Sequence, residues 1–192
     1  MTHAAIGVNA RAMYRLFVAL RPPPAIRAAL ASLMEGVPGA RWQDDEQLHL
    51  TLRYIGEVDR RLAEDAAVAL SAIVAPPVVL RLDGIGRFER RGRANALWAG
   101  VAPHDAIAAL HRKIDRALVR VGLAGEPRAY LPHITLARLG ASTAPVEPWL
   151  ARHAGLASEP FEIAHFGLYE SHLGSEGARY EAIARWSLRE GG

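Results

Sequence analysis

The sequence predicts a mixed α and β fold made of two similar lobes. Apolar runs typical of strands alternate with amphipathic segments typical of helices, and together they indicate about eight strands and three helices. A short pattern, His-x-Thr between aliphatic residues, occurs at 48–52 and again at 132–136. The two histidines, His49 and His133, are 133 − 49 = 84 positions apart, close to half of the chain. We therefore expect a duplicated unit arranged around a pseudo-two-fold axis.

In the first half of the chain, each element has its own local signal. The mostly apolar run 14–20 predicts a central strand, and the prolines at 22–24 suit the first turn of a helix that ends at Gly36. Further along, we expect a short strand at 40–42, an acidic turn at 44–46, a strand at 48–56 and a helix at about 60–73.

The second half repeats the alternation. A strand at 78–82 and another at 96–101 flank a basic loop, so this loop is expected at a hairpin-like connection. A helix at about 105–121 has an apolar stripe and ends at Gly122. The remaining elements are expected at 131–139 (strand), near 148–150 (a short helix), 161–169 (strand) and 179–188 (strand).

Composition narrows the class of protein. A chain of 192 residues with 51% apolar residues can bury a substantial core, and no linker separates two domains. We expect one bilobal domain at 13–190, preceded by a flexible leader at 1–12. The chain has no cysteine, which excludes disulfides, thiolate metal sites and cysteine nucleophiles. Because no signal-peptide or membrane-spanning run is present, we expect a cytoplasmic protein without a membrane partner.

The basic residues are almost all arginine. The net charge is only +3, and Lys113 is the sole lysine. Arginine binds phosphate in a planar, bidentate manner. A codon bias towards arginine and alanine explains the bulk of them equally well, so only the placement of particular arginines is informative.

The two His-x-Thr strands suit chemistry at phosphorus. In each, alternation places the histidine and the threonine on one face: His49 with Thr51, and His133 with Thr135. One imidazole can accept a proton while the other donates one, and the hydroxyls can donate to anionic oxygens. Such a set fits in-line displacement at a phosphate and needs neither metal nor cofactor. A single strand with this pattern would more often only place its histidine and threonine on the solvent-exposed face of a sheet. The occurrence of the pattern twice therefore favours a catalytic site.

Several stretches carry a family resemblance beyond the two motifs, and they extend from about Tyr14 to Leu188. The chain resembles the 2H phosphoesterase superfamily, specifically the RNA 2′,3′-cyclic phosphodiesterases historically called LigT or 2′-5′ RNA ligases. The matching stretches are 15–20, 41–42, 48–52, 55–58, 97–101, 132–138, 169–174 and 180–181.

The resemblance implies an α+β bilobal fold, with two antiparallel sheets lining a central groove and helices outside. It further implies opening of a 2′,3′-cyclic phosphate at an RNA end to leave a 2′-phosphate. On this basis His49 is the proton donor to the departing 3′ oxygen and His133 the acceptor that activates water. Thr51 and Thr135 hold the non-bridging oxygens. The residues themselves leave the two histidine roles interchangeable.

Two more positions follow from the resemblance: Arg138 near the phosphate, and Tyr54 stacked on the terminal base. Each lies five residues after its histidine, an offset that strict alternation sends to the opposite face, so a bulge or a strand end is required. Otherwise Arg138 is an edge-of-sheet arginine and Tyr54 packs in the core. Arg87, Arg90, Arg91 and Arg93 either guide the RNA backbone or form a solvated hairpin tip.

The remaining aromatic and histidine residues are expected to be structural. Trp42 and Trp98 are interpreted as core residues. The histidines outside the motifs, interpreted as surface or packing residues, are His3, His104, His111, His153, His165 and His172.

The main hypothesis is a monomeric, metal-independent enzyme acting on RNA 2′,3′-cyclic phosphate ends or 2′,3′-cyclic nucleotides. The same site suits other small cyclic phosphates, including ADP-ribose cyclic phosphate, and 2′-5′ linkages, including reversible ligation. An RNA-end binding module without turnover is the non-enzymatic alternative, but binding alone does not require two titratable groups.

Overall fold

The computed structural model describes residues 13–174 and 177–190. Its helices are α1 (Pro24–Ala31), α2 (Arg60–Ser71), α3 (His104–Arg120) and α4 (Glu147–His153), with a single 3₁₀ turn, η1 (Asp45–Gln47). Its strands are β1 (Tyr14–Leu20), β2 (Ala40–Trp42), β3 (Leu50–Val58), β4 (Val78–Arg90), β5 (Arg93–Ala102), β6 (His133–Leu139), β7 (Phe161–Ile163), β8 (His165–Gly174) and β9 (Gly177–Ser187). The leader expected at 1–12 lies outside the described residues.

The strands form two antiparallel halves that meet at the middle of the sheet. Their order is β7-β4-β5-β6-β3-β1-β8-β9, and β2 also pairs with β6. The two halves are joined where β3 meets β6, and in the described part of the chain they share one residue pair there, Leu50 with Ile134. The predicted α+β architecture of two lobes is therefore confirmed, with each lobe contributing four strands to this path.

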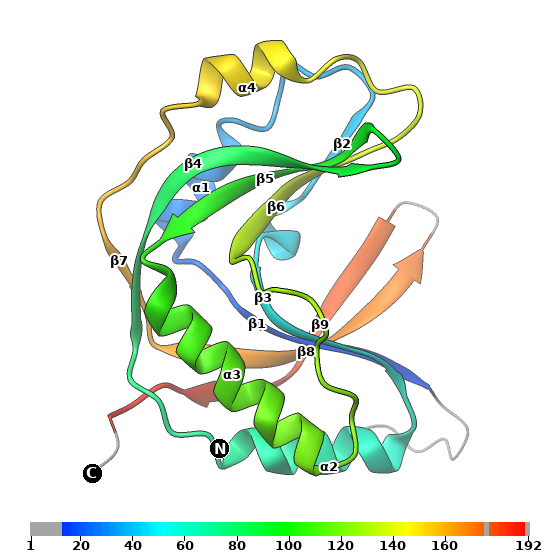
Figure 1. Ribbon diagram of the computed structural model, residues 1–192, viewed down its shortest axis with the longest axis vertical. Coiled ribbons are helices and arrows are strands. Elements are labelled where there is room, and N and C mark those ends of the chain that lie inside the picture. The colour runs from blue at the N-terminus through cyan, green and yellow to red at the C-terminus, as the bar shows by residue number, and fades with distance from the viewer. Residues whose placement is uncertain (1–12, 175–176, 191–192) are drawn as a thin grey trace.

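The helices cover the outside of the sheet (Figure 1). α2 and α3 lie side by side and pack against β1, β3 and β4, while α4 lies at the opposite end of the molecule. The apolar stripe of α3 is buried as its sequence pattern predicts, with Ile107, Leu110, Ile114 and Leu118 facing the sheet. Burial of such side chains contributes about 1.5–3 kcal/mol each and fixes which face of the sheet stays open for a site.

Beta bulges follow both His-x-Thr patterns. On β3, Ala19 pairs with Thr51 but Val18 pairs with Arg53, so Leu52 is the extra residue. On β6, Trp98 pairs with Thr135 but Leu97 pairs with Ala137, so Leu136 is the extra residue. Each bulge leaves two consecutive buried residues and returns the next side chain to the face of the histidine and threonine.

Several elements differ from the sequence-based expectation. α1 ends at Ala31, before the predicted end at Gly36. β4 continues to Arg90, well beyond the predicted end at residue 82, because Arg91 and Gly92 form a two-residue turn with positive φ angles of 54° and 72°. The single strand expected at 161–169 is split at Ala164 into β7 and β8. β7 pairs with β4 and β8 with β1, so the chain passes here from one lobe to the other.

Candidate active site

The two motif histidines flank the pair that joins the lobes. Leu50, next to His49, pairs with Ile134, next to His133. In an antiparallel pair the neighbouring positions face each other crosswise, so Thr51 lies beside His133 and His49 beside Thr135. The sequence-predicted quartet thus comes together around this junction, since His49 directly precedes β3, Thr51 lies on β3, and His133 and Thr135 lie on β6.

Both imidazoles are held by the same kind of hydrogen bond. The Nδ1 atom of His49 lies 2.7 Å from the Gln47 carbonyl oxygen, and the Nδ1 atom of His133 lies 2.8 Å from the Leu131 carbonyl oxygen. Since a carbonyl only accepts, each Nδ1 carries the proton and donates it. Each Nε2 is therefore the atom that can gain or lose a proton, a prerequisite for acid–base work at the same substrate.

Aromatic rings surround each histidine. His49 packs against Phe17 and Tyr180 with ring centroids 4.9 and 5.1 Å apart, and His133 packs edge-on against Phe88 at 4.7 Å. The pKa of His49 is lowered from 6.5 to about 4, chiefly by burial and in smaller part by the nearby charges of His133 and Arg138, while the hydrogen bond to the Gln47 carbonyl opposes the shift. Burial, and then the charge of Arg138, also lowers the pKa of His133. Both histidines are consequently neutral at pH 7 in the free protein.

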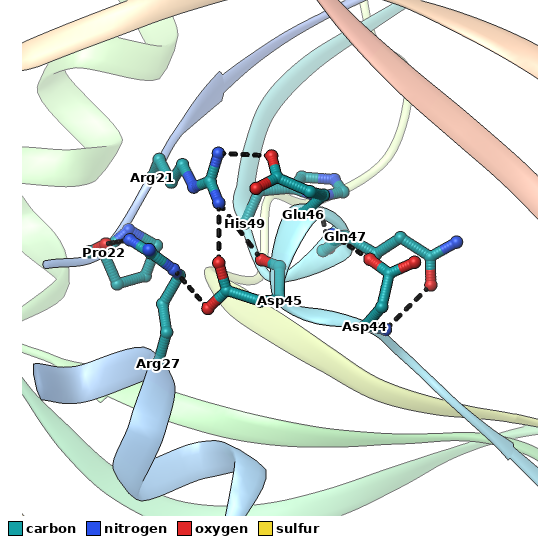
Figure 2. Close-up of polar contacts among 8 residues, drawn as sticks. All are labelled: Arg21, Pro22, Arg27, Asp44, Asp45, Glu46, Gln47 and His49. Atoms are coloured by element: carbon teal, nitrogen blue, oxygen red, sulfur yellow. Dashed lines mark hydrogen bonds and ion pairs between the residues drawn. The ribbon is translucent and has the colours of Figure 1, made fainter. Parts of the chain in front are cut away.

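The turn before His49 is fixed by a polar network (Figure 2). Arg21 donates to the carboxylates of Glu46 at 2.7 Å and Asp45 at 2.9 Å, and Arg27 donates to the other Asp45 oxygen at 2.8 Å. Asp44 and Gln47 form a capping box around η1, with the Gln47 N–H donating to Asp44 at 2.9 Å. These contacts hold the Gln47 carbonyl that orients the His49 ring.

Tyr54 and Arg138 share the site face because of the two bulges. They occupy equivalent positions, two residues past the extra residue of β3 and β6, and both line one pocket of about 330 Å³. This arginine pocket includes Arg41, Trp42, Gln47, Tyr54, Arg138 and Tyr180. The motif histidines do not line it directly, but Tyr180 lines it and also packs against His49. The pocket therefore borders the His49 side of the histidine pair.

A model of the 2′-5′ RNA ligase superfamily matches residues 22–175 of the chain. The chain belongs to this superfamily.

Relatives in the superfamily match most of the chain. An RNA 2′,3′-cyclic phosphodiesterase of Methanocaldococcus jannaschii is 29% identical over 177 residues, which cover 90% of this chain and 99% of that protein. One of Geobacillus stearothermophilus is 30% identical over 154 residues, 79% of this chain, although the chain spans only about half (49%) of its length. Escherichia coli LigT complexed with 3′-AMP is a structural neighbour, with a TM-score of 0.75 at 27% identity over 92% of this chain and 99% of that one. These neighbours confirm the LigT-like fold.

The carbonyl groups freed around the β3 bulge of this superfamily member are bonded by side chains. The Tyr130 hydroxyl donates to the Thr51 carbonyl at 3.0 Å, and the His111 Nδ1 donates to the Leu52 carbonyl at 2.7 Å. The His111 and Tyr130 rings stack with centroids 4.1 Å apart. Arg53, only 7% exposed, donates to the Tyr54 carbonyl and pairs with Asp115 at 2.7 Å. Helix α3 and the segment before His133 thus hold the bulge that presents Thr51 and Tyr54.

The core interpretation of Trp98 is wrong. Trp98 pairs with Thr135 on the site face, is only partly buried, and packs against Phe88 at 5.6 Å and His133 at 6.2 Å. A Cβ atom at Gly86 would collide with the indole, so this glycine provides the space in which Trp98 lies. A glycine at position 86, inside a strand, is the feature of the sequence that accompanies this arrangement. Trp42 has a double role, since it packs against Trp149 and also lines the arginine pocket.

The basic segment 87–93 is a hairpin tip, as its alternative interpretation expects. Arg87 is paired with Glu89 at 2.8 Å and Glu147 at 2.6 Å, and Arg93 donates to the Ala141 carbonyl at 2.8 Å. Two of the four arginines are therefore committed to contacts within the protein.

Of the histidines expected to be structural, His111 is buried and His104 is exposed, while His172 lies 3.4 Å from Glu181. His3 lies outside the described residues. Within the described ranges, no cluster of three or more His, Asp or Glu side chains is arranged to hold a metal ion. None of the described helices is both long and apolar enough to cross a membrane.

Proposed function

We propose that the protein hydrolyses 2′,3′-cyclic phosphates at RNA ends to 2′-phosphomonoesters, by a two-histidine acid–base mechanism that needs no metal. The superfamily and the names of the curated relatives support the phosphodiesterase activity. Residue roles are proposed for His49 and His133, with Thr51, Thr135 and Arg138 as phosphate-binding residues and Tyr54 as a base-stacking residue.

The matched hydrogen bonding of the two imidazoles is the observation that carries this proposal. Each Nδ1 is held by a main-chain carbonyl two residues earlier in the chain, at 2.7 and 2.8 Å, which leaves each Nε2 for the substrate. A site that only binds an anion does not require two neutral imidazoles held in fixed orientations. Proton transfer at both the entering and the leaving oxygen does need them.

In the proposed reaction a water oxygen attacks the phosphorus while the P–O3′ bond breaks. His133 Nε2 accepts the proton of the water, and His49 Nε2–H gives its proton to the departing O3′. The phosphate remains attached through O2′, and the two histidines end with their protonation states exchanged. Hydroxyls of Thr51 and Thr135 donate to the non-bridging oxygens, where charge is concentrated in the transition state.

The lowered pKa values imply that His49, the general acid, becomes protonated only when the substrate binds. His49 has a pKa of about 4 in the free protein, so it is neutral at pH 7. A phosphodiester anion between the rings favours the imidazolium form and raises that pKa. Proton uptake should therefore accompany substrate binding.

We further infer that the protein acts as a monomer, in the cytoplasm. The four motif side chains and the arginine pocket all come from one chain, so a second copy is not required to complete the site.

The test is hydrolysis of an RNA oligonucleotide ending in a 2′,3′-cyclic phosphate, in the presence of EDTA. We expect turnover to a 2′-phosphate, and a loss of about 10²–10⁴-fold in kcat for His49→Ala and for His133→Ala. His104→Ala, an exposed histidine on α3, is the matched control and should keep full activity. Full activity of either motif variant, or turnover abolished by EDTA, would contradict the proposal.

A further inference from the structure

Two arginines stand directly opposite each other at the edge of the arginine pocket. Arg41 on β2 pairs with Arg138 on β6, and both side chains are exposed. Like charges in directly opposed positions destabilise an antiparallel pair. Neither arginine makes an ion pair with another side chain in the described part of the chain, in contrast to Arg15, Arg21, Arg27 and Arg87. The position therefore suits an anion from outside the protein.

The pocket opens where β3 leaves β6. β5 occupies one edge of β6, and the other edge pairs with β3 at Ile134 and with β2 at residues 137–139. Between the diverging strands lies the pocket of about 330 Å³, at the small end of the range of ligand sites. Its carboxylate is Asp44, whose side chain is engaged in the capping box of η1.

The pocket is connected to the histidine pair through one aromatic ring. Tyr180 packs edge-on against His49 at 5.1 Å, and the charges of Arg138 and Arg41 both act on its hydroxyl. Tyr54, which is 50% exposed, lies on the same pocket. Tyr180 therefore lies next to His49, and Arg41 and Arg138 line the same pocket as Tyr180. A nucleotide whose cyclic phosphate binds at the histidines would extend past Tyr180 towards these two arginines.

We propose that Arg41 is a specificity-determining residue that binds the 5′-phosphate of the terminal nucleotide. Arg138, whose charge also acts on both histidines, lies between that phosphate and the reacting one. The preferred substrate is then a nucleotide that carries a phosphate at its 5′ position, as every nucleotide within an RNA chain does, over a nucleoside 2′,3′-cyclic phosphate with a free 5′-hydroxyl. This inference rests on the proposed function and names its substrate class.

The experiment compares three substrates with the same terminal base: a nucleoside 2′,3′-cyclic phosphate, its 5′-phosphorylated form, and a dinucleotide ending in the cyclic phosphate. For the wild type we expect kcat/KM to rise by tenfold or more when the 5′-phosphate is added. A further rise with the dinucleotide would measure the contribution of the second nucleoside. The gain should shrink as salt is raised, since a phosphate contact releases counterions.

Arg41→Gln should remove most of the 5′-phosphate gain while changing kcat/KM for the 5′-hydroxyl substrate far less. Arg41→Lys should keep part of the gain, because it retains the charge without the planar fork. Arg112→Gln, an exposed arginine on α3, is the control that should keep the whole gain. Because Arg41→Gln relieves a like-charge pair, its melting temperature should equal or exceed that of the wild type.

Equal kcat/KM for all three substrates in the wild type would overturn the inference. So would an Arg41→Gln variant that keeps the gain or loses activity equally on every substrate. These results differ from a failure of the proposed function, in which the wild type would turn over none of the three.

Discussion

Leu50 on β3 pairs with Ile134 on β6, and each of these buried residues directly follows a motif histidine. This contact joins the two lobes, and it does so by pairing the first His-x-Thr motif with the second. The antiparallel register then brings each threonine beside the histidine of the other lobe. The site therefore forms where the two lobes join, and each lobe supplies one histidine and one threonine.

The pH dependence of stability should report the burial of His49. The folded state favours the neutral ring, with a pKa of about 4, whereas an unfolded histidine titrates near 6.5. The unfolded chain binds the extra proton between these values, so the free energy of unfolding should fall as the pH drops from 6.5 to 4. At about 1.4 kcal/mol per pKa unit, His49 contributes a loss on the order of 3 kcal/mol.

Urea unfolding at a series of pH values measures this loss. His49→Gln should flatten the curve between pH 6.5 and 4, and His133, whose pKa is also lowered, should leave a smaller slope. A wild-type curve that is flat over this range would show that the His49 ring is freely protonated in the folded protein.

Two aspartates offer a matched pair for the turn that orients His49. Asp44 caps η1 through the Gln47 N–H at 2.9 Å, and Asp59 caps α2 through the Leu62 N–H at 2.8 Å. Replacing either cap by alanine should destabilise the protein by about 1 kcal/mol. Only Asp44→Ala loosens the segment that carries the Gln47 carbonyl, so it alone should lower kcat, by about tenfold. If both variants have wild-type kcat, the capping box does not position His49.

Gly86 should be essential for the ring that packs beside His133. In Gly86→Ala the new methyl group collides with the Trp98 indole, which must move towards His133 or Phe88. We expect a destabilisation of about 1–3 kcal/mol together with a reduced kcat. Gly155→Ala is the control, because a Cβ atom there meets no neighbour within 4 Å. Equal thermal stability and activity of the two variants would refute the role assigned to Gly86.

Local patterns in the sequence were sufficient to predict most helices and strands and the duplication of the His-x-Thr motif in two lobes, but the direct pairing of β3 with β6 was not predicted. Amphipathic stripes and alternation are local signals, and the α3 stripe is buried as predicted. The bulges at Leu52 and Leu136 were not predicted as such, although the resemblance required them if Tyr54 and Arg138 were to face the site. A bulge is defined by the partner strand, so the register with β1 and β5 was needed to locate it.

The error at Trp98 has a similar physical origin. β5 is apolar on both faces, since Leu97 and Ala99 lie in the core while Trp98 lies on the site face. Because polar and apolar residues do not alternate along this strand, the sequence could not show which face is buried. The role of His111 depends on a carbonyl 59 residues earlier in the chain, the Leu52 oxygen freed at the bulge. The role proposed for Arg41 could not be predicted from the sequence, because it depends on the strand register that places Arg41 opposite Arg138.

A substrate with sulfur in place of the bridging 3′ oxygen tests the central claim most directly, that His49 and His133 act as acid and base on one phosphate. A thiolate leaves without needing a proton, so loss of the general acid should matter little. Measured as kcat/KM, hydrolysis of this substrate should be restored to near the wild-type rate in His49→Ala and should stay low in His133→Ala. Restoration in His133→Ala with none in His49→Ala would contradict the assigned roles, and equal loss in both variants would contradict the acid–base mechanism.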